Sequence, residues 1–128
     1  LALYEKARLE AKALGNGAQA LSTLDEHRRR FPGGVLTSEV AFTRIDLLMQ
    51  LGKRAEALAA IDQGLHGALG RERGAELHLM RASLLAGGGD CNAALQAAGA
   101  AREAGVLPSR LEAIERRCAT PSLEPEGR

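Results

Sequence analysis

The stretch LGKRAEALAAI at residues 51–61 contains the pattern that decides the fold. Gly52 follows a segment with helical periodicity, and Ala57-Leu58 follows this glycine by five residues. Glycine readily adopts the left-handed conformation that ends a helix. A small alanine allows two helix axes to approach closely. The stretch therefore predicts the turn of a helical hairpin and the start of its second helix.

The same pattern recurs along the chain with a period of 37 residues. Its glycine column is Gly15, Gly52 and Gly89, and glycine is not what a helix-forming composition supplies by chance. The other repeated positions are Ala20, Leu21, Ala57, Leu58, Ala94 and Leu95, and Pro32 follows the first unit. A fixed period of this length is typical of stacked helical hairpins.

The predicted architecture is all-α, an α-α superhelix (solenoid) of three hairpins with a C-terminal capping helix. The hairpins are expected at residues 2–30, 37–66 and 74–104, the cap at 109–118, and a single domain over 1–118. The predicted helices are 2–14, 18–30, 37–51, 54–66, 74–87, 91–104 and 109–118. Residues 119–128 contain two prolines and one large apolar residue, which predicts a flexible tail. Because the chain starts at Leu1 without a leader, we expect a domain of a longer polypeptide.

The composition of the 128 residues agrees with a helical fold. The chain has 24 Ala and 21 Leu but only 6 Val and Ile together, which leaves little material for a β-sheet. No apolar run reaches the roughly 18 residues that a membrane span needs. A net charge of +1 and an aromatic content of 2% argue against a nucleic-acid-binding protein.

The repeated columns resemble the tetratricopeptide repeat (TPR), whose period is usually about 34 residues. The similarity extends over residues 2–105 and is clearest in Leu51-Gly52, Ala57-Leu58 and Ile61. It implies a protein-interaction module in which the first helix of each hairpin lines a concave groove. The hairpin ending in Phe31-Pro32 also resembles the TPR-like C-terminal domains of bacterial cell-envelope proteins.

The resemblance assigns ten residues to a partner-binding groove. They are Glu5, Leu9, Lys12, Glu39, Phe42, Asp46, Met49, Glu76, Leu79 and Ser83. Their mixture of acidic and large apolar side chains suits a peptide or helix with apolar anchors and a basic residue. The alternative is that the apolar members pack against neighbouring helices.

The two cysteines are candidates for a disulfide. Cys91 begins a helix and Cys118 ends the next one, so two antiparallel helices bring them near each other. A bridge would stabilise the cap by roughly 3–4 kcal/mol and would indicate an oxidising compartment such as a periplasm. The alternative is a pair of unrelated buried thiols.

No catalytic, cofactor-binding or metal-binding constellation is recognisable. His27, His66 and His78 lack the spacing of a zinc site. Gly87-Gly88-Gly89 before Asp90 is interpreted as a helix end followed by an N-cap, since no lysine of a phosphate loop follows. The run Arg28–Arg30 is interpreted as a solvated helix end, with contact to anionic lipid or RNA as the alternative.

The expected function is therefore a non-enzymatic protein–protein interaction module. In the envelope context it would serve assembly, division or anti-sigma-type regulation, binding a protein, a peptide or another domain of its own chain. The alternatives are a homo-oligomerisation or spacer domain, a nucleic-acid-binding helical repeat and, least supported, an enzyme. We expect a periplasmic or envelope-facing location, with the cytoplasm as the alternative.

Overall fold

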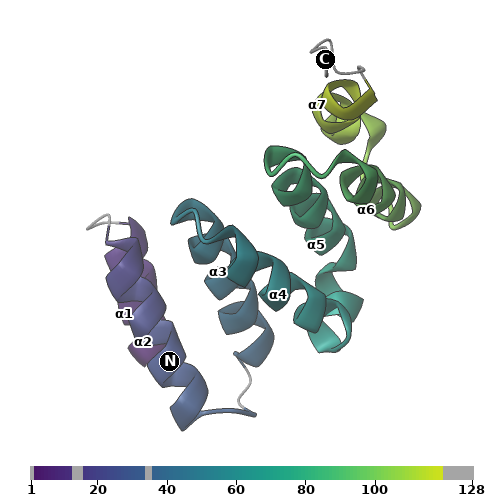
Figure 1. The fold of residues 1–128 in the computed structure, drawn as a ribbon. Coiled ribbons are helices and arrows are strands. Elements are labelled where there is room, and N and C mark those ends of the chain that lie inside the picture. The colour runs from purple at the N-terminus through teal and green to yellow at the C-terminus, as the bar shows by residue number, and fades with distance from the viewer. Residues whose placement is uncertain (1, 13–15, 34–35, 120–128) are drawn as a thin grey trace. The chain divides into compact units, whose positions relative to one another are not determined.

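The computed structural model describes residues 2–12, 16–33 and 36–119, which form seven α-helices and no strand (Figure 1). The helices are α1 (Ala2–Lys12), α2 (Gly17–Arg30), α3 (Thr37–Gln50), α4 (Arg54–Leu65), α5 (Ala68–Gly87), α6 (Cys91–Glu103) and α7 (Pro108–Ala119). The all-α prediction is confirmed. The superhelical stacking and the 37-residue period stay predictions.

Local sequence signals account for several helix ends. Gly52 and Gly89 have φ angles of 75° and 89°, in the left-handed region predicted for both. Gly15 lies outside the described residues. The Asp90 side chain accepts a hydrogen bond from the Ala93 backbone N–H at 3.2 Å, so it caps α6 as predicted. Asn16 caps α2 in the same way through Gln19.

The start of α5 differs from the prediction. Helix was expected from residue 74, but α5 begins at Ala68. Arg73 interrupts it with φ −135° and ψ 30°, which are not helical values. The segment around Gly67 and Gly70 was expected to separate two hairpins, yet helical turns already form from Ala68 onward. Arg73 thus lies immediately before residue 74, where the sequence predicted that the helix begins.

The chain forms two compact units, residues 1–69 and residues 70–128, called here the first and second units. In the first unit α1 packs on α2, α2 on α3 and α3 on α4. Its main apolar cluster joins the first three of these helices through Ala7, Ala20, Leu24, Val40 and Leu47. Tyr4 of α1 and Thr43 of α3 add a hydrogen bond of 3.3 Å between their hydroxyl groups. The extent of one domain over 1–118 stays a prediction.

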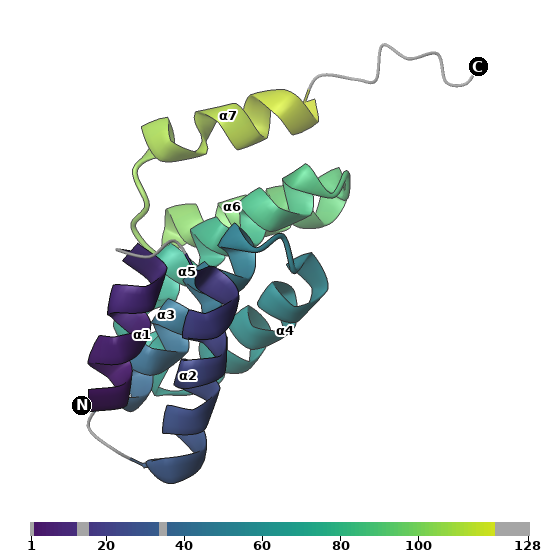
Figure 2. The same ribbon diagram turned by 90° about the vertical axis from the view of Figure 1, so that its left-hand side faces the viewer.

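In the second unit α6 packs on α7, as Figure 2 shows. A core built mostly of alanines joins α5, α6 and α7, and its buried members are Ala82, Ala97, Ala98, Ala101, Val106 and Leu111. Cys91 of α6 and Cys118 of α7 form a disulfide, with their Cα atoms 5.2 Å apart. An ion pair between Arg102 and Glu115 also joins these two helices.

The repeated alanines and leucines differ in burial. Ala20, Ala57 and Ala94 are all fully buried, which suits positions where helices approach closely. Leu95, in contrast, is 38% exposed, so the third position of the leucine column is not part of the buried core. Within the part of the chain described, no helix combines the length and apolar character needed to cross a membrane.

Candidate functional site

The first unit contains an open cleft of about 680 Å³. Its walls are the C-terminal end of α2, the N-terminal half of α3, the C-terminal end of α4, and the start of α5 at Ala68 and Leu69. Ligand-binding clefts in proteins usually have volumes of about 300–1,000 Å³. The size of the cleft therefore fits a side-chain cluster or a short peptide segment.

Charged side chains gather on the α2 and α3 walls of the cleft. The Arg44 Nε donates a hydrogen bond of 2.9 Å to the Asp25 carboxylate, which joins α3 to α2. Arg28 lies 3.4 Å from the same carboxylate oxygen. Arg29 also lines the cleft, and no ion pair or hydrogen bond of its side chain occurs among the described residues. The wall thus carries three arginines against one aspartate.

An aromatic pair stands at the α2 end of the cleft. The rings of His27 and Phe31 lie 5.2 Å apart and are tilted by 50°. His27 is buried, whereas Phe31 is 49% exposed and lies directly after the last residue of α2. A large half-exposed aromatic ring beside arginines is typical of the anchor positions in protein interfaces.

Apolar side chains form part of the remaining surface of the cleft. Val40 and Ile45 of α3 are buried residues that line it, and Leu69 lines it from the start of α5. Cleft residues on α3 follow helical spacing, since Ala41, Arg44 and Ile45 share one face. The cleft therefore combines a charged wall with an apolar floor.

The groove predicted from the sequence is a different surface. None of its ten residues lines the cleft. On α3, Glu39 and Asp46 are exposed while Phe42 and Met49 are partly buried, and all four lie on another face of the helix. On α1, Glu5 and Leu9 are exposed, and the side chain of Lys12 lies outside the described residues. These positions of the first unit thus lie away from the cleft described above.

The other three predicted groove residues belong to the second unit. Leu79 packs against the apolar cluster of α5, α6 and α7, which is the packing role left open as the alternative. Glu76 forms an ion pair of 3.3 Å with Arg110 of α7. Ser83 is exposed on α5. Two of these three side chains thus have structural contacts of their own.

Sequence reasoning missed the residues of the cleft. Arg28 and Arg29, interpreted from the sequence as a solvated helix end, are exposed in the last turn of α2 and also line the cleft. His27 lies in the last turn of α2, where its ring is buried against Phe31. One signal was present: His27 and Phe31 are four residues apart, the spacing that brings side chains together at a helix end.

Among the described residues, no cluster of three or more His, Cys, Asp or Glu side chains is placed to hold a metal ion. Comparisons with protein-family models, with curated proteins and with solved structures find no significant match. The likeness to the TPR therefore depends on the repeated residues alone.

Proposed function

We propose that this chain is a non-enzymatic, TPR-like protein-interaction module and that the cleft of the first unit is its binding surface. The observation that carries the proposal is the half-exposed Phe31 at the rim of a cleft of about 680 Å³. Half-exposed aromatic rings next to arginines at a cleft are typical of the anchor positions in protein interfaces. The proposal moves the binding surface from the predicted concave groove to the ends of α2, α3 and α4.

Two features support the TPR-like assignment. The helical segments predicted for the three hairpins agree with the observed helices, except at the start of α5. The turn glycines Gly52 and Gly89 have the same backbone conformation at equivalent positions of two predicted repeats. A helical repeat of this kind builds binding surfaces from the sides and ends of its helices without catalytic groups.

The cellular setting is part of the same proposal. The disulfide between Cys91 and Cys118 supports an oxidising compartment, since such bonds persist in a periplasm and are rare in the cytosol. We therefore place the module in the bacterial envelope, as one domain of a larger protein of the assembly, division or anti-sigma type. Its partner is a protein segment or another domain of the same chain.

The two phenylalanines of the chain provide a matched test. Phe31→Ala removes the exposed ring at the cleft, and Phe42→Ala makes the same change on the predicted groove face of α3. In quantitative affinity capture from the native cells, we expect Phe31→Ala to reduce the captured partner about tenfold or more, as for an interface anchor. We expect Phe42→Ala to capture most of the partner that the original chain captures.

Circular dichroism on both variants checks that each remains folded. Loss of capture with Phe42→Ala and retention with Phe31→Ala would return the binding surface to the predicted groove. Equal capture by the original chain and both variants would contradict a role for either face.

A further inference from the structure

The charge of the cleft defines what it can bind. Arg28, Arg29 and Arg44 line it together with the single carboxylate of Asp25, an excess of two positive charges. Asp25 is already engaged by Arg44 and Arg28, whereas Arg29 has no such partner among the described residues. Arginine guanidinium groups bind carboxylates in bidentate hydrogen-bonded pairs. The charged wall is thus complementary to an acidic ligand.

The backbone adds to the same electrostatic preference. The helix α3 begins at the cleft, where Thr37 and Ser38 are lining residues. Its N-cap residue Leu36 supplies no side-chain hydrogen bond to the first turn. The first backbone N–H groups of a helix carry a partial positive charge and favour an anion.

A buried polar side chain independently indicates a ligand. His27 lines the cleft and is only 4% exposed. Its ring contacts Phe31, but its nitrogen atoms make no hydrogen bond with any described residue. Buried polar groups in native proteins nearly always have a hydrogen-bond partner. A ligand group that enters the cleft can supply the partner that the imidazole lacks.

We propose that the cleft binds an acidic peptide segment of the partner, with carboxylates on the arginine wall and a bulky apolar side chain beside Phe31. This inference rests on the proposed function, since it names the chemical class of the segment that the module binds. The apolar floor of Val40, Ile45 and Leu69 favours a peptide over a nucleic acid. One exposed aromatic ring at the cleft provides little stacking surface for bases.

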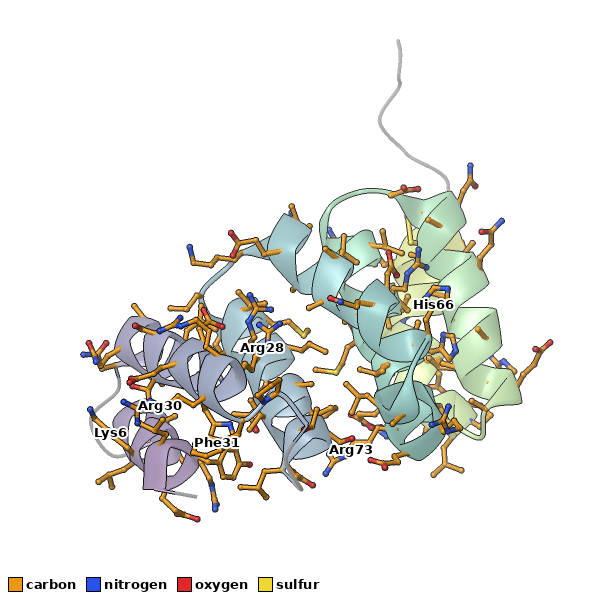
Figure 3. The ribbon with its side chains drawn as sticks, turned by 90° about the horizontal axis from the view of Figure 1, so that it is seen from below. Lys6, Arg28, Arg30, Phe31, His66 and Arg73 are labelled. Carbon is orange, nitrogen blue, oxygen red and sulfur yellow. A yellow bond between two sulfur atoms is a disulfide. The ribbon has the colours of Figure 1, made fainter. Side chains whose placement is uncertain are left out.

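Adjacent arginines supply a matched pair of variants for the test. Arg29→Glu reverses a charge in the cleft wall. Arg30→Glu makes the same change at the next residue, which does not line the cleft and pairs with Glu26 at 3.2 Å. Figure 3 shows Arg28 and Arg30 projecting from different sides of α2. Both variants alter exposed side chains, so both are expected to fold, which circular dichroism verifies.

The experiment is a selection of displayed random 12-residue peptides on the full chain. We expect peptides enriched in Asp and Glu together with a bulky apolar residue, both on the original chain and on Arg30→Glu. On Arg29→Glu the acidic enrichment should be lost, and the best acidic peptide should bind about tenfold more weakly by calorimetry. Raising the salt concentration should lower the affinity of the original chain for that peptide.

Three results of the peptide selection would overturn the inference. They are enriched peptides without an acidic bias, acidic enrichment that Arg29→Glu leaves unchanged, and absence of any enriched peptide. Tighter binding of a single-stranded 12-nucleotide RNA probe than of the best peptide would also overturn it. The capture experiment with Phe31→Ala tests the proposed function separately. If capture of the partner depends on Phe31 but not on Arg29, the cleft remains the binding surface and only the assignment of an acidic ligand is wrong.

Discussion

Replacing Leu24 by alanine is expected to lower the free energy of unfolding by about 2–5 kcal/mol. Leu24 of α2 is fully buried and belongs to the cluster that joins α1, α2 and α3. The substitution removes the apolar burial of the leucine and leaves a cavity that its helical neighbours fill only in part. Urea denaturation of Leu24→Ala, followed by far-ultraviolet circular dichroism, measures the loss.

Leu9→Ala is the matched control because it makes the same change on α1, where the side chain is 60% exposed. We expect its effect to be about 0.5 kcal/mol or less, since exposed side chains of this kind contribute little to stability. Similar losses for both variants would show that the apolar cluster of the first unit is wrongly assigned.

Removing the disulfide is expected to destabilise the second unit by about 3–4 kcal/mol. Cys91 and Cys118 are separated by 27 residues, and the bridge limits the conformations of that loop in the unfolded chain. The variant that carries both Cys91→Ala and Cys118→Ala should therefore melt at a lower temperature than the oxidised chain. Thermal denaturation by circular dichroism gives the difference.

A reductant provides the control for this variant. It should lower the melting temperature of the original chain toward that of the double alanine variant and leave the variant itself unchanged. Two titratable thiols in the purified, non-reduced chain, measured under denaturing conditions, would contradict the disulfide. Equal melting temperatures of the oxidised chain and the variant would contradict its stabilising role.

The helices were predictable because their signals are local. Gly52 and Gly89 end helices through their own backbone freedom, and Asp90 caps α6 through the backbone N–H of Ala93. The disulfide could be considered from sequence because sequential antiparallel helices bring Cys91 and Cys118 together. The start of α5 was missed because glycine near residues 67–70 lowers helix propensity without preventing a helical turn.

The cleft could not be predicted because residues from four helices form it. Phe31, Arg44 and Leu69 lie far apart in the sequence, and only the packing of the first unit places them around one cavity. The repeat pattern gave no means of distinguishing Arg29 in the wall from Arg30 outside it. The family resemblance predicts binding residues at Phe42 and Met49, which lie on another face of α3.

The most direct test of the account is photo-cross-linking in the native cells, with p-benzoylphenylalanine at position 31 or at position 42. Both proteins retain an aromatic ring at the substituted position. The comparison therefore shows whether a partner contacts the cleft at position 31 or the predicted groove face at position 42. We predict a covalent adduct with a second protein at position 31 and none at position 42. An adduct at position 42 alone, or an adduct at position 31 that contains only a second copy of this chain, would contradict the proposed cleft as the surface for a different protein.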